Sequence, residues 1–112
     1  MVVDDEHFNR LSLKVIFEII GLKNHQDVIV EARNGKQAFD ILVEDVMKNN
    51  QEFTNFDLIL MDFQMPIMNG NEASEKIREY LYMRDLEQPI ICGLTGHIEP
   101  QYIRQFLDSG MN

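Results

Sequence analysis

The sequence has a single cysteine, Cys92, among its 112 residues, and it has no tryptophan. One cysteine excludes an internal disulfide, and because Cys92 lies in an apolar stretch we expect it to be a core residue rather than a nucleophile. No apolar run approaches the roughly 20 residues of a membrane-spanning helix, and the first residues lack a secretory signal pattern. We therefore expect a cytoplasmic domain, which leaves open a membrane anchor elsewhere in a longer parent chain.

Basic residues are also scarce, with 10 Lys and Arg against 19 Asp and Glu and a net charge of -9. This balance argues against nucleic-acid binding by this domain, because phosphate contacts require clustered positive charge. It suits a protein partner with a basic face and a bound metal ion, although solubility explains most of the excess. We expect no membrane contact, and the absence of a Gly-x-Gly-x-x-Gly motif leaves dinucleotide binding unsupported.

Short apolar runs alternate with amphipathic stretches along a chain of single-domain length, and hydrophobic residues make up 45% of it. A chain of this size buries roughly 65% of its unfolded surface, which is enough for one core. The pattern predicts strands at 1–3, 28–30, 56–61 and 90–94, and helices with apolar stripes at 8–20, 38–46, 73–81 and 103–107. Such alternation indicates an α/β fold with a parallel sheet and right-handed crossovers.

The stretch from Asp57 to Gly70 contains the most informative polar residue. Its apolar run 58–61 reads as a strand buried on both faces, and the run stops at Asp62. Asn69, with Glu72 three residues on, resembles a capping box, so a helix is expected to begin there. Asp62 is thus predicted at the carboxyl end of a central strand, where open α/β sheets bind ligands. Taken alone, it could equally end the strand or cap a turn.

The start of the chain repeats this pattern, because the apolar residues 1–3 stop at Asp4 and Asp5. If the two strands are neighbours in one sheet, Asp4, Asp5 and Asp62 converge at its edge. Three close carboxylates repel one another, which raises their pKa values unless a cation neutralises them. A hard, oxygen-preferring divalent cation such as Mg²⁺ is the natural solution.

Three blocks of sequence together resemble a known family. The segment 2–6 with Asn9, the segment 60–70 and the pair Leu94-Thr95 resemble the receiver domain of two-component response regulators, in the variant fused to or served by hybrid histidine kinases. The resemblance implies a flavodoxin-like doubly wound parallel sheet with strand order 2-1-3-4-5. It also implies that residues 1–112 form a C-terminally incomplete receiver, because the family's fifth strand, fifth helix and a lysine on that strand would follow Asn112.

The resemblance further implies a phosphorelay function. Asp62 would accept a phosphoryl group from the phosphohistidine of a histidine kinase or histidine phosphotransfer domain. Mg²⁺ would be held by Asp5, Asp62 and the backbone carbonyl of Gln64, with Asp4 acting through a water molecule. Thr95 would be the switch residue, although a strand threonine can also simply bond its hydroxyl locally. Such a domain is not an enzyme beyond its own phosphorylation and dephosphorylation, but a parent chain could be a histidine kinase.

Two departures from the family pattern carry further expectations. The segment 89–95 is one residue longer than usual, so we expect a bulge near Cys92 and Gly93; without it, Thr95 would face the wrong side of the sheet. The missing fifth strand would leave strand 90–94 as an exposed edge that favours self-association.

The missing lysine leaves open a degenerate receiver that only binds partners. A phosphohydrolase of the haloacid-dehalogenase type ranks lower, because Gln64 stands where that family needs a second aspartate.

Overall fold

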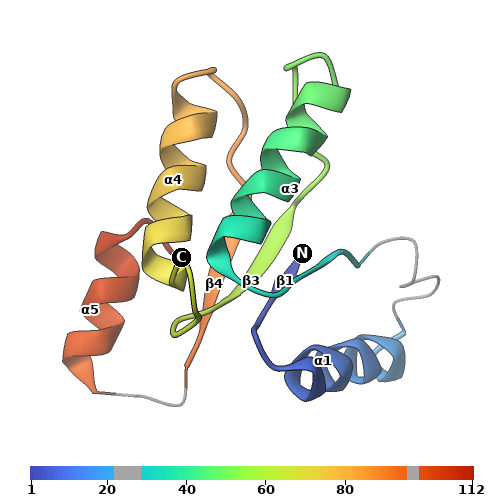
Figure 1. Ribbon diagram of the computed structural model, residues 1–112, viewed down its shortest axis with the longest axis vertical. Helices are drawn as coiled ribbons and strands as arrows, with labels where there is room; N and C mark the ends of the chain where they lie inside the picture. Colours follow the sequence, from blue (N-terminus) through green and yellow to red (C-terminus); the bar gives the residue numbers. More distant parts are fainter. Residues whose placement is uncertain (22–28, 96–98) are drawn as a thin grey trace.

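The computed structural model describes residues 1–21, 29–95 and 99–112, and strands and helices alternate along the chain (Figure 1). The strands are β1 (Val2–Val3), β2 (Glu31–Ala32), β3 (Leu58–Asp62) and β4 (Ile90–Leu94), and the helices are α1 (His7–Ile19), α3 (Gly35–Lys48), α4 (Gly70–Tyr82) and α5 (Pro100–Asp108). All neighbouring strands are parallel, in the order β2-β1-β3-β4. The predicted α/β class and the strand order 2-1-3-4 are therefore confirmed.

The main core lies between the sheet and the helices α3, α4 and α5. Ile59 and Met61 of the central strand β3 and Ile91 of the edge strand β4 are fully buried. The helices cover them with Ala38, Leu42, Val46, Ala73, Ile77, Leu81 and Phe106. The stripes predicted on α3 and α4 thus form the core, whereas on α5 only Phe106 is buried, and Ile103 and Leu107 are exposed. Helix α5 lies at the β4 end of the sheet, where the Phe106 ring approaches Gly93 of β4.

Helix α1 lies apart from the other three helices (Figure 1). Its apolar row is largely exposed, with Phe8 at 73% and Ile19 at 77% of full exposure, and its one buried residue is Arg10. A cavity of about 160 Å³ is lined by Phe17 of α1 and by the strand residues Val2 and Leu60. This side of the sheet is therefore covered less tightly than the side of α3 and α4. Within the described ranges, no helix is both long and apolar enough to cross a membrane.

The boundaries of two strands differ from those predicted. β2 occupies Glu31–Ala32 rather than 28–30; Val28 lies outside the described residues, and Val30 accepts a hydrogen bond from the Val2 amide at 2.9 Å. The apolar run misled the prediction because Glu31 pairs in register with Val2 and its charge is neutralised by basic residues of α1. β3 runs from Leu58 to Asp62 rather than over 56–61, which makes Asp62 the last residue of the strand.

Strand β4 has the predicted bounds, but the predicted bulge is wrong. Its residues pair one to one with those of β3, from Leu58 with Ile90 to Asp62 with Leu94. Gly93 serves close packing instead, because a Cβ atom there would lie 2.9 Å from the Met111 sulfur and 3.1 Å from the Phe106 ring. The glycine that suggested a bulge is therefore explained by the approach of α5 and the residues that follow it.

Arg78 of α4 fastens two other segments to the core. It donates hydrogen bonds to Gln88 Oε1 (3.0 Å), the Pro89 carbonyl (2.6 Å), the Gly110 carbonyl (2.7 Å) and Asn112 Oδ1 (2.8 Å). Asn112 in turn bonds the edge of β4: its amide donates to the Ile91 carbonyl at 2.7 Å, and its side-chain oxygen accepts from the Ile91 amide at 2.9 Å. The edge of β4 is therefore covered at Ile91.

Candidate functional site

Three aspartates meet at the carboxyl ends of β1 and β3. Asp4 and Asp5 follow β1, and Asp62 ends β3, the parallel neighbour in which Met61 pairs with Val3. One carboxylate oxygen from each of the three lies within 4.8 Å of the others. The structure thus brings together the three residues that the sequence predicted to converge.

The three carboxylates have different surroundings. Asp4 is buried, and its two oxygens accept hydrogen bonds from the Glu6 amide at 2.9 Å and from the Asn9 side-chain amide at 3.2 Å. Asp5 is exposed and Asp62 is half-buried. The buried Asp4 is therefore pinned by its neighbours, while Asp5 and Asp62 present their carboxylates to the surface.

Asp62 is under electrostatic strain when no cation is present. Its pKa is raised from 3.8 to about 6, first by burial, then by the charge of Asp4, with smaller contributions from Asp5 and Glu6. The Phe63 amide, which donates to Asp62 Oδ1 at 2.8 Å, opposes this increase. The three side chains offer only carboxylate oxygens, and their negative charges repel one another. Such a cluster fits a hard divalent cation such as Mg²⁺, which prefers oxygen ligands and neutralises the charge.

Two adjoining hollows open onto Asp62. The larger, of about 500 Å³, is lined by Asp4, Asn9, Ser12, Leu13, Asp62, Gly93, Leu94 and Thr95. The second, of about 280 Å³, is lined by Asp5, Glu6, Asn9, Asp62, Phe63, Gln64 and Thr95. Both share Asn9, Asp62 and Thr95, so a ligand at the Asp62 carboxylate has α1 on one side and the end of β4 on the other.

Thr95 reaches this site although β4 has no bulge. It is exposed, follows the last paired residue Leu94, and lines both hollows with Asp62. The expectation that an unbulged strand turns Thr95 away is therefore wrong, because beyond Leu94 the alternation of the strand no longer fixes the side-chain direction. Gln64 lies in the second hollow beside Asp5, and the role of its carbonyl as a metal ligand stays a prediction.

The segment after Asp62 is folded tightly against the strand end. The Gly70 amide donates to the Phe63 carbonyl at 2.9 Å, and Asn69 caps α4 by accepting from the Glu72 amide at 2.9 Å. A Cβ atom on Gly70 would overlap the backbone oxygen of Asp62. The predicted cap is thus confirmed, and a glycine is required where α4 begins against the site.

The Phe63 side chain, at the wall of the second hollow, packs on α5. Its ring lies edge-on to Phe106, with centroids 4.9 Å apart, and to Tyr102 at 6.1 Å. The residue next to Asp62 therefore contacts a helix at the end of the sheet.

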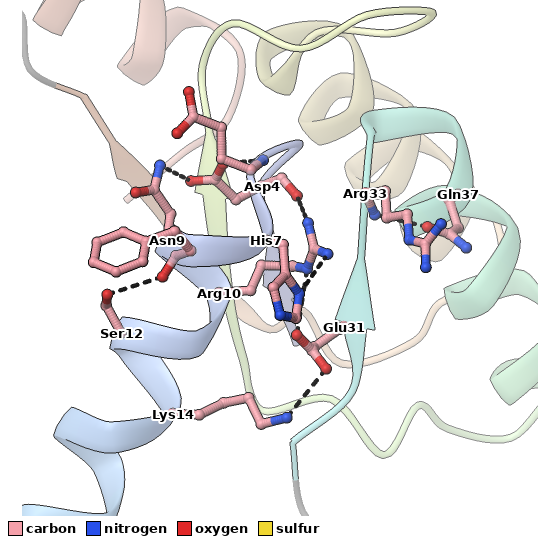
Figure 2. A network of polar contacts seen from close by, with 11 residues as sticks. Asp4, His7, Asn9, Arg10, Ser12, Lys14, Glu31, Arg33 and Gln37 are labelled. Carbon is pink, nitrogen blue, oxygen red and sulfur yellow. Dashed lines mark hydrogen bonds and ion pairs between the residues drawn. The ribbon is translucent and has the colours of Figure 1, made fainter.

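Sequence reasoning missed a polar network behind the aspartates, which Figure 2 shows. Arg10 donates to the backbone oxygen of Asp4 at 2.7 Å and pairs with Glu31 at 3.3 Å, and Lys14 pairs with the same carboxylate at 3.2 Å. Burial tends to raise the pKa of Glu31, but the hydrogen bonds and charges of Lys14 and Arg10 outweigh it and hold that pKa below its usual value. Only Asn9 had a signal in the sequence, through the family pattern.

Comparison with known proteins agrees with this geometry. The family model described as "Response regulator receiver domain" matches residues 1–112. The chain is 34% identical to "Two-component response regulator 24" of Arabidopsis thaliana over 112 residues, which is 100% of this chain and 68% of that protein. It is also 34% identical over 114 residues to "Osmosensing histidine protein kinase SLN1" of Saccharomyces cerevisiae, of which it covers only 8%.

Solved structures show the same likeness. The receiver domain of the Arabidopsis thaliana histidine kinase CKI1, complexed with Mg²⁺, matches with a TM-score of 0.84 and 26% identity, over 98% of this chain and 76% of that one. The receiver domain of the Saccharomyces cerevisiae response regulator Ssk1, crystallised with the histidine phosphotransfer protein Ypd1, matches with a TM-score of 0.76 and 27% identity, over 99% and 72%. The chain belongs to the response regulator receiver domain family, a family of phosphorelay signalling.

Proposed function

We propose that this domain accepts a phosphoryl group on the carboxylate of Asp62 in a Mg²⁺-dependent transfer from a phosphohistidine. The observation that carries the proposal is the convergence of Asp4, Asp5 and Asp62, with Asp62 alone both half-buried and open to two hollows. In the transfer, the bond between the donor's imidazole nitrogen and phosphorus breaks, and a bond forms between phosphorus and an Asp62 oxygen. The imidazole retains the electron pair and is later protonated by solvent.

The residues around Asp62 are suited to orient this reaction. The Phe63 amide holds Asp62 Oδ1 at 2.8 Å and so fixes the carboxylate plane before the donor arrives. Asp5, Asp62 and the Gln64 carbonyl would hold Mg²⁺, with Asp4 acting through water. When bound, Mg²⁺ supplies positive charge that neutralises the phosphoryl oxygens. The Thr95 hydroxyl would then donate to a phosphoryl oxygen and draw its loop toward Asp62, which is the proposed switch.

The proposed donor is a histidine kinase or a histidine phosphotransfer domain. The complex of Ypd1 with the Ssk1 receiver supports this class of partner. On this chain, exposed apolar residues of α1 begin three residues after Asp5 with Phe8 and continue with Leu11, Val15 and Ile19. Such a row beside a charged site favours docking of a protein partner, and the net charge of -9 favours one with a basic face.

Incubation with a small-molecule phosphodonor and Mg²⁺, followed by intact-mass measurement, tests the acceptor. The wild-type chain should gain one phosphoryl group, and Asp62→Ala should gain none. Asp57→Ala is the matched control, because Asp57 is an exposed aspartate that directly precedes β3 at its opposite end. Phosphorylation that persists in Asp62→Ala would place the acceptor elsewhere.

Titration calorimetry tests the metal site independently of phosphoryl transfer. Asp5→Asn removes one charged ligand, so Mg²⁺ affinity should fall by about tenfold or more. Without metal, the same change should leave the free energy of unfolding level or raise it, because carboxylate repulsion decreases. Unchanged Mg²⁺ binding by Asp5→Asn would show that the cation binds at another place.

A further inference from the structure

Helix α1 is attached to the rest of the fold at an unusual residue. Arg10 is the one buried residue of α1, and its side chain is only 6% exposed. A buried cation is costly unless it is paired and hydrogen-bonded. Since apolar residues of the same helix, such as Phe8 and Ile19, remain exposed, the burial of Arg10 is not a by-product of general helix packing. It requires a specific reason.

The guanidinium of Arg10 joins three parts of the chain (Figure 2). One terminal nitrogen donates to the Asp4 backbone oxygen at 2.7 Å, Nε donates to Glu31 Oε1 at 3.3 Å, and the other terminal nitrogen lies 3.5 Å from His7 Nδ1. The bond to Asp4 is charge-assisted and therefore among the stronger kinds of hydrogen bond. The planar fork presents separate nitrogens in fixed directions to the end of β1 and to β2, whereas a lysine offers a single nitrogen.

Arg10 donates to the backbone carbonyl oxygen of Asp4, which belongs to the peptide group linking Asp4 to Asp5. The other side of the same turn is held by the Asp4 carboxylate, which accepts from the Glu6 amide and from the Asn9 side chain. The peptide between the two acidic residues is thus fixed from both sides. Loss of either support would let Asp5 rotate away from Asp62.

We propose that Arg10, held in place by Glu31, is a positioning residue that orients the Asp4–Asp5 peptide so that Asp5 and Asp62 bind one divalent cation. This inference rests on the metal site of the proposed function. Arg10 does not touch the cation; it acts through the backbone of Asp4.

The through-space charge of Arg10 and its positioning role have opposite effects on Mg²⁺ affinity. A positive charge near the site repels Mg²⁺, so removal of the charge alone should strengthen binding. Removal of a positioning hydrogen bond should weaken it. Lys14 is a matched control, because it lies one turn further along α1 and pairs with the same Glu31 carboxylate at 3.2 Å.

The experiment compares the wild-type chain with Arg10→Met, Arg10→Lys and Lys14→Met by calorimetric titration with Mg²⁺. Arg10→Met should bind about tenfold more weakly. Arg10→Lys should recover part of the loss, because lysine restores the charge and one hydrogen bond but not the fork. Lys14→Met should bind with equal or slightly higher affinity. In metal-free protein, the Glu6 amide should exchange its hydrogen faster in Arg10→Met, while amides of α3 and α4 stay unchanged.

Binding by Arg10→Met as tight as that of Lys14→Met would overturn the inference. If circular dichroism shows that Arg10→Met does not fold, Arg10→Lys decides in its place, and wild-type affinity in that variant would overturn it. If the wild-type chain binds no Mg²⁺, the proposed metal site fails separately. Glu6 amide exchange then still tests Arg10, and equal exchange rates in the wild-type and variant chains would refute the positioning role.

Discussion

The ring of Phe63 packs edge-on against the ring of Phe106, with centroids 4.9 Å apart and an interplanar angle of 81°. Phe63 directly follows Asp62, and Phe106 is the buried residue of α5. Edge-on aromatic pairs contribute about 0.5–1.5 kcal/mol beyond the area they bury. A change in charge at Asp62 therefore has a short mechanical connection to α5, distinct from the connection through Thr95.

Phe63→Leu should weaken both the fold and this connection. We expect the free energy of unfolding to fall by about 1 kcal/mol, because the aromatic contacts with Phe106 and Tyr102 are lost while an apolar side chain remains. Denaturant unfolding measures the loss, with Phe53→Leu as the control because Phe53 is 47% exposed. Equal losses in the two variants would show that the aromatic contacts of Phe63 contribute nothing specific.

Gly70→Ala should disrupt the site by displacing the backbone of Asp62. The new Cβ atom would overlap the backbone oxygen of Asp62 and lie 3.0 Å from Met61 Cγ, so the end of β3 has to move. We expect a loss of about 3 kcal/mol in the free energy of unfolding and weaker Mg²⁺ binding. Gly93→Ala should cost less, about 1 kcal/mol, because its Cβ meets side-chain atoms of Met111 and Phe106 that can shift. The opposite ranking by thermal or denaturant unfolding would contradict this reasoning.

The stability of the metal-free chain should depend on pH through Asp62. Its pKa is raised from 3.8 to about 6, so the folded state favours the protonated form; the contribution is fully present below about pH 3.8 and is lost as pH rises through 6. The shift corresponds to at most about 3 kcal/mol, and solvent screening at this half-exposed carboxylate reduces it to about 1 kcal/mol.

Asp62→Asn isolates this contribution from those of the other carboxylates. In the presence of a chelator, the variant should match the wild type in free energy of unfolding near pH 4 and exceed it by about 1 kcal/mol near pH 7. Saturating Mg²⁺ should remove that advantage, because the cation stabilises the ionised wild-type cluster. A difference between the two chains that does not change with pH would contradict the raised pKa.

The isolated chain should self-associate through the less covered side of the sheet. Leu58 and Ile90 are register partners, and they are 38% and 56% exposed. An apolar pair beside a sheet edge favours contact with a second chain. Sedimentation should show a concentration-dependent dimer that Ile90→Lys abolishes. Met83→Lys, at an exposed position after α4, is the control, and a wild-type chain that stays monomeric at high concentration would refute the prediction.

Local patterns predicted most of the fold. The apolar run before Asp62 located β3, the cap at Asn69 located the start of α4, and the alternation of strands and helices gave a parallel sheet. These features depend on neighbours in the sequence. The apolar run and the parallel sheet together place Asp62 at the carboxyl end of β3. The predicted bounds of β2 were wrong, because a strand of two residues is defined by its pairing with β1 and not by an apolar run.

Long-range contacts account for what the sequence could not show. A charged residue such as Arg10 is usually exposed on a helix. Here it is buried because Glu31, 21 positions away, pairs with it. Gly93 suggested a bulge, whereas its role is set by Phe106 and Met111, which arrive from beyond β4. Both require the tertiary structure, and both lie next to the site rather than in its predicted motif.

The hydrogen bonds of Arg78 have a consequence for how the domain opens. Because one guanidinium binds the carbonyls of Pro89 and Gly110 and the Asn112 side chain, these segments cannot separate from α4 one at a time. Breaking the cluster would remove the hydrogen bonds of the half-buried Arg78 and release Ile91 from Asn112 in the same event. The end of the sheet at β4 should therefore detach as one cooperative unit, and the hydrogen bonds of Arg78 should contribute to the free energy of that partial unfolding.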